Sequence, residues 1–189
     1  MYMFGMSREI RTDVKKANEE AIEIERYSKD FRVRVSINFS WKPEPSSSGS
    51  RLVDNILKGF GNFSVRITTE DVINPEVIEN MGFAFGEALS RMHEKRKAKP
   101  SSSCIHSESG MMCMFAFDTK QDGDASMQVT GRPEFDSEHF FSFFDGFAQG
   151  FDSELSAVIN FGKKKSSQNH QLRLVSRTFG KSIEQMFSV

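Results

Sequence analysis

The pentapeptide Gly82-Phe83-Ala84-Phe85-Gly86 returns 64 residues later as Gly146-Phe147-Ala148-Gln149-Gly150. Each copy lies in a segment whose apolar spacing otherwise predicts a helix. A glycine inside a helix costs about 1 kcal/mol relative to alanine unless close packing offsets the loss. Two glycines four residues apart lie on one face of a helix and let another backbone approach. The motif therefore predicts either two similar halves or two helices that pack unusually closely.

The sequence leaves the duplication itself open. The order strand, strand, helix surrounds both copies of the motif, which favours two related halves. Counting 100° per residue, however, places the buried stripe of the first copy on a different side of its glycines from the Phe-rich stripe of the second. A rival similarity joins Phe85–Met92 to Phe179–Met186 and keeps its apolar stripe. Ordinary amphipathic periodicity accounts for that similarity equally well.

The apolar periodicities predict an α+β fold in which an antiparallel sheet is covered by helices. Strict alternation over Phe31–Trp41 predicts a strand with one buried face, and Phe63, Val65 and Ile67 predict another. Two further strands are expected over Met111–Phe117 and around Met127 and Val129, joined by a hairpin turn at Asp122-Gly123. Helices are expected over residues 7–29, 52–57, 74–97, 136–159 and 171–187.

These elements predict one domain over residues 1–189. Its diverged halves, 31–97 and 111–160, are related by a pseudo-two-fold, with 7–29 as an extra N-terminal helix and 171–187 as a C-terminal one. Three serine-rich breaks, at 43–50, 99–110 and 163–169, read as mobile surface loops.

Composition narrows the class of protein without naming a partner. The formal net charge is −1, the chain has two cysteines, and its 19 Phe indicate a large apolar core. With no signal peptide and no apolar stretch of membrane-spanning length, we expect a soluble cytoplasmic protein of a reducing compartment.

Catalytic and metal-binding patterns are sparse. No phosphate-binding loop, nucleophile elbow or zinc-protease motif occurs in the sequence. Cys104, His106 and Cys113 have a spacing that fits no common zinc module. The simpler interpretation is that Cys113 is a buried thiol in an apolar strand. The sequence accordingly predicts no cofactor, no metal site and no enzymatic activity.

Basic side chains carry the functional hypothesis. If the apolar positions of the strands pack on the helices, the opposite face carries arginines among neutral hydrogen-bonding side chains and no carboxylate. Such a face, bordered by a lysine-rich loop, suits a phosphate backbone. The predicted nucleic-acid-binding residues are Arg32, Arg34, Asn38, Arg66, Lys163, Lys164, Lys165, Arg173 and Arg177.

Two hypotheses from different classes follow. The first is a non-catalytic protein that binds RNA or single-stranded DNA through this basic face and loop. The second is a protein-interaction module, such as an inhibitor, adaptor or assembly component, that uses the Phe-rich helix and the acidic segment 118–154 as its contact surface. In that case the glycine pairs could also be where a second copy of the chain packs.

Overall fold

A computed structural model of the chain describes residues 9–39, 47–121, 123–163 and 166–188. The elements follow one another in this order: β1 (Arg11–Ala17), β2 (Ala21–Tyr27), β3 (Arg32–Asn38), α1 (Arg51–Leu57), β4 (Ser64–Thr69), α2 (Pro75–Arg96), β5 (Ser101–Glu108), β6 (Met111–Asp118), β7 (Ala125–Thr130), α3 (Ser137–Phe151), β8 (Glu154–Asn160) and α4 (Gln168–Phe187). None of the helices among these residues combines the length and the apolar character needed to cross a membrane.

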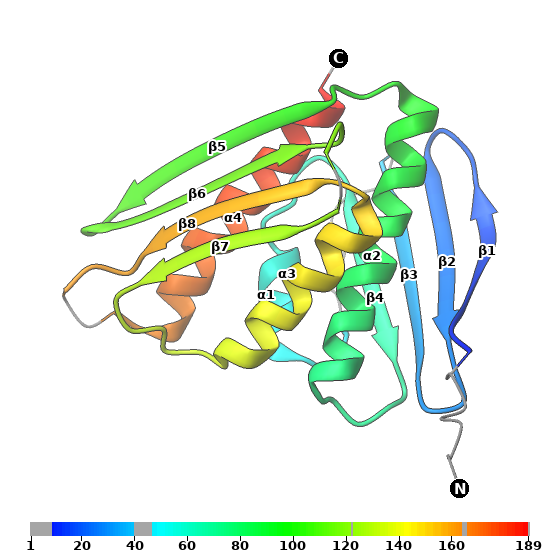
Figure 1. The fold of residues 1–189 in the computed structure, drawn as a ribbon, viewed down its shortest axis with the longest axis horizontal. Helices are drawn as coiled ribbons and strands as arrows, with labels where there is room; N and C mark the ends of the chain where they lie inside the picture. The colour runs from blue at the N-terminus through cyan, green and yellow to red at the C-terminus, as the bar shows by residue number, and fades with distance from the viewer. Residues whose placement is uncertain (1–8, 40–46, 122, 164–165, 189) are drawn as a thin grey trace, which may run out of the picture.

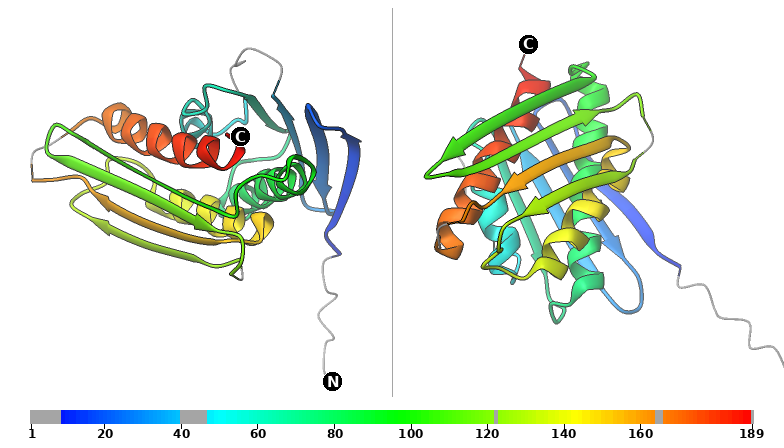
Figure 2. Two further views of the ribbon diagram at one scale, coloured as in Figure 1. Left: turned by 90° about the horizontal axis from the view of Figure 1, so that it is seen from above. Right: turned by 60° about the vertical axis from the view of Figure 1, so that its left-hand side comes forward.

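Two four-stranded sheets enclose the helices (Figures 1 and 2). Sheet A has the order β1-β2-β3-β4 and is antiparallel throughout. Sheet B has the order β5-β6-β8-β7, and its β7 and β8 are parallel. Helix α2 packs on β2 and β3, whereas α4 packs on β5 and β6, so each sheet has an inner face against helices and an outer face turned away from them.

The order of elements repeats between the halves, which agrees with the predicted α+β fold and its pseudo-two-fold. The run β2-β3-α1-β4-α2 corresponds to β5-β6-α3-β8-α4, and the strand order β2-β3-β4 matches β5-β6-β8. Strand β1 is additional in sheet A, and β7 has no counterpart among the described residues there. The first helix of each half packs on the second helix of the other, because α1 contacts α4 and α3 contacts α2.

The glycine motif lies at the crossing of α2 and α3, as the close-approach interpretation predicts. A Cβ placed on Gly82 would overlap the carbonyl oxygen of Phe143, and one on Gly146 would overlap that of Glu79. Gly59, just after α1, and Gly180 of α4 make the corresponding contact between the other pair of helices. Both glycine pairs of the motif are therefore used within the chain, and they do not form a surface for a second copy.

Phenylalanine rings fill the space between the sheets. The Phe179 ring lies within 5.1 to 6.4 Å of rings from both halves, including Phe60 of the first and Phe144 of the second. The Phe-rich helix α3 buries all its phenylalanines except Phe141, which is 36% exposed. The prediction that this helix forms a contact surface is thus wrong, because its rings form the core.

The expected N-terminal helix over 7–29 is wrong for every described residue of that range. Residues 11–17 and 21–27 form the antiparallel strands β1 and β2, joined at a turn where the Asn18 side chain accepts hydrogen bonds from the N–H groups of Glu20 and Ala21. A β-bulge between Val14 and Lys16 shifts the pairing by one residue. The bulge and the turn interrupt the alternation of apolar positions, so the spacing of the apolar residues in the sequence resembles that of a helix.

Three other expectations fail in the second half. The helix expected over 136–159 ends at Phe151, where Asp152 adopts a left-handed conformation, and residues 154–160 form β8. Much of the serine-rich break at 99–110 is strand β5 rather than a loop. The hairpin expected near Asp122-Gly123 does not pair β6 with β7, because β8 lies between them. Asp122 itself lies outside the described residues.

Candidate functional site

The arginines of the predicted nucleic-acid face lie on the outer face of sheet A. Arg32 and Arg34 are exposed on β3, and Arg66 of β4 lies opposite Ser36 in the register. Asn38 is half-buried at the end of β3. The sequence placed these side chains on one face correctly, but it did not identify their neighbours.

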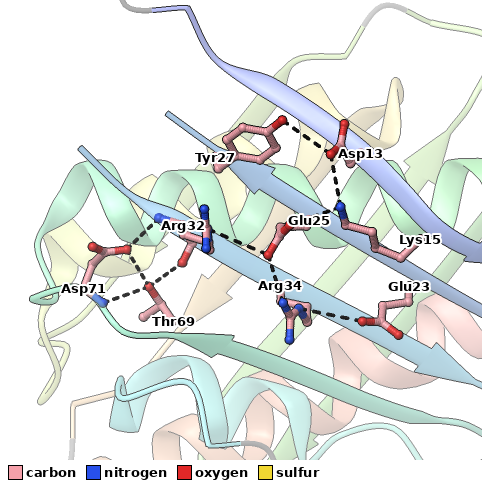
Figure 3. A network of polar contacts seen from close by, with 9 residues as sticks. All are labelled: Asp13, Lys15, Glu23, Glu25, Tyr27, Arg32, Arg34, Thr69 and Asp71. Carbon is pink, nitrogen blue, oxygen red and sulfur yellow. Dashed lines mark hydrogen bonds and ion pairs between the residues drawn. The ribbon is translucent and has the colours of Figure 1, made fainter. Parts of the chain in front are cut away.

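Strand β2 brings carboxylates onto the same face (Figure 3). Glu25 lies directly opposite Arg34, and the two side chains approach to 3.0 Å. Lys15 and Arg32 approach Glu25 to 3.3 and 3.8 Å, and Glu23 lies 3.7 Å from Arg34. The prediction of a carboxylate-free face is wrong, because it depended on assigning the segment that holds Glu23 and Glu25 to a helix.

The pKa of Glu25 reflects the cations that surround its carboxylate in this ion-pair network. The hydrogen bond from Arg34, with a further one from Lys15, holds the pKa of the Glu25 carboxyl below its ordinary value in spite of burial. Beside it, the backbone N–H of Arg32 donates to Asp71 at 2.6 Å. Because Arg32 and Arg34 already have carboxylate partners, they are poor candidates for recognising a phosphate backbone.

The remaining predicted residues lie elsewhere in the fold. Lys163 is exposed between β8 and α4, whereas Lys164 and Lys165 lie outside the described residues. Arg173 and Arg177 are exposed one turn apart on α4, and Arg173 donates to Glu108 of β5 at 2.6 Å. Arg173 and Arg177 thus belong to the helix that packs on sheet B (Figure 1), whereas Arg32, Arg34 and Arg66 belong to strands of sheet A.

Cys104, His106 and Cys113 lie on the inner face of sheet B without forming a metal site. The Sγ of Cys104 lies 3.6 Å from Nδ1 of His106. Burial raises the pKa of the Cys104 thiol, lowers that of the His106 ring and raises that of the Cys113 thiol to about 12, so all three favour their neutral forms. Among the residues that the structure describes, no three His, Cys, Asp or Glu side chains gather closely enough to hold a metal ion.

A cavity of about 470 Å³, called here the α1–α4 cavity, is hollowed where α1 meets the first turn of α4. It is lined by Ser47, Gly49, Arg51, Asp54, Asn55, Lys58 and Asn169. The residues from α1 lie on one side of that helix because positions three, four and seven apart share a face. Ser50 begins the helix by accepting a hydrogen bond from the N–H of Val53.

The cations of this cavity have neutral partners. Arg51 donates to the side-chain oxygen of Asn169 at 3.3 Å, and Lys58 donates to that of Asn55 at 2.9 Å. Within the described part of the chain neither forms an ion pair with a carboxylate, unlike the arginines of sheet A. Asp54 is the one carboxylate of the lining, and its Oδ1 accepts the N–H of Ser48 at 2.8 Å. The charged lining of the α1–α4 cavity is therefore two cations and one carboxylate, and among the described residues neither cation forms an ion pair with it.

A second cavity of about 350 Å³, the α2–α3 cavity, lies at the corresponding junction of the other helix pair. Its charged lining is acidic and comprises Glu79, Asp124 and Asp145. Burial, reinforced by the charge of Asp124, raises the pKa of the Asp145 carboxyl above its ordinary value. The charged linings at the two helix junctions thus have opposite net sign, which makes the α1–α4 cavity the candidate site for an anionic ligand.

Comparisons with known proteins identify the fold. No protein-family model matches the sequence, and no curated protein matches it closely. Solved structures do match, including imidazoleglycerol-phosphate dehydratase (IGPD) from Pyrococcus furiosus in complex with (S)-C348, at a TM-score of 0.70 and 17% identity over 87% of this chain and 93% of that one. The imidazoleglycerol-phosphate dehydratase from Staphylococcus aureus subsp. aureus N315 has a TM-score of 0.68 and 16% identity, over 93% and 97% of the two chains.

These similarities show that the chain has the duplicated α+β fold of those dehydratases. They also overturn the functional prediction, because the two solved structures named above are structures of an enzyme rather than of a nucleic-acid-binding protein. The expectations of a non-catalytic protein and of RNA or single-stranded DNA as partners are therefore wrong. The identity is too low to transfer an activity from the dehydratases to this chain.

The sequence interpretation missed Arg51, Lys58 and Asn169. The signal in the sequence was the placement of two cations seven residues apart in a helical segment, which puts them on one face. Asn169 reaches them only because α4 packs on α1. It accepts a hydrogen bond from Arg51 although 118 positions separate the two residues in the sequence. No local pattern indicates that contact.

Proposed function

We propose that the protein is an enzyme that acts on a small phosphorylated molecule, whose phosphate group binds in the α1–α4 cavity. The observation that carries this proposal is the pair Arg51 and Lys58, two cations in one cavity with neutral hydrogen-bond partners. Arginine donates in a planar fork that matches phosphate oxygens, and lysine adds a compact positive charge. The amide groups of Asn55 and Asn169 can donate the remaining hydrogen bonds.

The dimensions and the fold support this class of substrate. The α1–α4 cavity is an open depression of about 470 Å³ with a polar lining, which has room for a small phosphorylated molecule. The dehydratases that share the fold are named for a substrate that is itself a small phosphate ester. A phosphorylated compound of similar size is thus the first ligand to test.

Asp54 is the group that we assign to proton transfer. Removing water from a substrate requires a group that takes up a proton from carbon and returns one to the departing hydroxyl. Asp54 is the lining carboxylate of the cavity, and its Oδ1 is held in place by the N–H of Ser48. Its second oxygen is the atom assigned to the substrate.

Isothermal titration calorimetry with imidazoleglycerol phosphate, and with inorganic phosphate as a minimal probe, tests the binding step. A charge-assisted hydrogen bond is worth about 1.5–3 kcal/mol, so Arg51→Ala and Lys58→Ala should each weaken binding about tenfold or more. Arg91→Ala is the matched control, because Arg91 is an exposed helical arginine that pairs with Glu87 on α2. Wild-type protein that binds neither ligand at low salt would refute the assignment of the cavity.

Turnover is a separate question from binding. Product formation from imidazoleglycerol phosphate, followed by mass spectrometry, should require Asp54, and Asp54→Asn should bind the ligand but form no product. Asparagine keeps the acceptor for the N–H of Ser48, so the local fold should survive. Binding without any conversion by the wild type would retain the ligand site and refute the enzymatic role on this substrate.

A further inference from the structure

The outer face of sheet B carries three adjacent rows of side chains without an ionisable group. The register places Ile105, Met114, Val158 and Gln128 in the central row. The row on one side holds Ser103, Ala116, Ser156 and Ser126. The row on the other side holds Ser107, Met112, Asn160 and Thr130. We call these twelve residues the uncharged face.

The apolar centre of the uncharged face has no cover within the described part of the chain. Successive residues of each strand alternate between buried positions, which pack on α3 and α4, and these more exposed ones. Ile105, on the edge strand β5, is 60% exposed. The next row toward one end holds the carboxylates of Asp118 and Glu154, so charge returns only at the margin.

The outer face of sheet A provides an internal comparison. Its strands carry the ion-pair network around Glu25, Arg32 and Arg34, which is the composition expected of a sheet face in contact with water. Soluble proteins also place charges on exposed strands to oppose association with other sheets. The two outer faces of this molecule therefore differ in chemistry, because that of sheet A carries paired charges whereas the uncharged face combines five apolar with seven neutral polar side chains.

We propose that the uncharged face packs against the same face of a second copy of this chain. An interface around a two-fold axis brings each patch onto itself, so it needs a surface that does not repel its own copy. A face without charge meets that condition, whereas it offers no complement to a charged partner such as a nucleic acid. Met112 and Met114 can adjust their side chains to an identical surface because methionine is unbranched and flexible.

The size of the face supports a weak, reversible contact. The three rows of the uncharged face span five residues of each strand, so a rise of about 3.3 Å per residue and a spacing of about 4.8 Å between strands give a face of about 16 by 19 Å. Two such faces amount to about 600 Å² of flat area, below the roughly 1,000 Å² expected of a stable specific interface. We therefore expect a weak association that depends on high protein concentration.

Light scattering after size-exclusion chromatography, repeated between about 5 and about 500 μM, tests the proposal over a concentration range suited to a weak association. The apparent mass of the wild type should rise with concentration from the 21.5 kDa of one chain toward twice that value. Ile105→Glu should weaken the association about tenfold or more, because it would place carboxylates in the interface without a cation to pair with them. Ile105→Ser should weaken it by a smaller factor, since it removes apolar contact without adding charge.

Thr68→Glu is the matched control, because Thr68 lies on an edge strand and on the outer face of sheet A, opposite Arg34. That variant should associate as the wild type does. Thermal unfolding of each variant verifies that its fold is retained. A wild type that stays at the mass of one chain throughout, or an association unchanged by both Ile105 variants, would overturn the proposal and leave the uncharged face to a different partner.

Discussion

At the scale of single residues, Glu25 organises the outer face of sheet A. Its side chain is 10% exposed and it is shared by Arg34, Lys15 and Arg32. Glu25→Gln removes the carboxylate charge that all three cations share, and we expect it to lower the free energy of unfolding by about 1 kcal/mol at neutral pH. Chemical denaturation of the two proteins under identical conditions measures the difference.

The pH dependence of that difference has a definite sign. The pKa of Glu25 is lowered in the folded state, so its stabilisation is present above the unfolded pKa of about 4.3 and is lost as the pH falls through the folded pKa. Wild type and Glu25→Gln should therefore converge in stability in acid. Glu23→Gln serves as control, because Glu23 is 37% exposed and lies 3.7 Å from Arg34, so its loss should cost less. A difference that persists unchanged in acid would contradict the assignment.

At the scale of elements, the crossing of α2 and α3 depends on its glycines. A Cβ on Gly86 would overlap the carbonyl oxygen of Phe147, and one on Gly150 would overlap that of Phe83. Gly86→Ala gains about 1 kcal/mol of helix propensity but forces two backbones apart, so we expect a net destabilisation of about 2 kcal/mol or more. Thermal or chemical unfolding measures this change.

Gly61→Ala separates the packing effect from the general effect of adding a methyl group. A Cβ there would meet only Glu184 Oε1, at the ordinary contact distance of 3.5 Å. Replacing glycine where the backbone allows it reduces the entropy of the unfolded chain, so this variant should be unchanged or more stable by up to about 1 kcal/mol. Equal losses in both variants would rule out the close crossing as the cause.

At the scale of the whole molecule, the two halves share one core. Helix α2 of the first half packs on α3 of the second, and α1 packs on α4, so the helices of the two halves form one continuous core. Residues 101–189 produced alone would expose the side of α3 that α2 covers, and we expect that fragment to lack cooperative unfolding. Circular dichroism during heating tests this, and mixing with residues 1–100 should restore a transition. A cooperative transition of the isolated fragment would contradict the shared core.

Comparison of sequence and structure shows where local patterns suffice. The start of α2 followed from Asn74 and Pro75, and Asn74 accepts the N–H of Val77 as a helix cap should. Strand β3 followed from strict alternation of buried and exposed residues. Strand β2 was missed although Ile22 and Ile24 alternate in it, because the bulge in its partner and the turn at Asn18 interrupt the period. That single error removed Glu23 and Glu25 from the predicted face and produced the wrong function.

The duplication illustrates the same limit. The shared pentapeptide drew attention to α2 and α3, yet these helices are the second of one half and the first of the other. The rival similarity between Phe85–Met92 and Phe179–Met186 joins α2 to α4, which hold the same place in the two halves. Sequence spacing alone could not choose between them, because amphipathic helices resemble one another whatever their ancestry.

The sequence by itself determined the class of fold, the extent of the longest helix and the need for a close backbone approach at the paired glycines. These depend on the preferences of neighbouring residues, which act over a few positions along the chain. Only the tertiary structure decided which charges are neutralised and which are available. Glu25 meets Arg34 across a sheet, and Arg51 meets Asn169 across 118 residues, so the charge of each site depends on contacts that no local pattern contains.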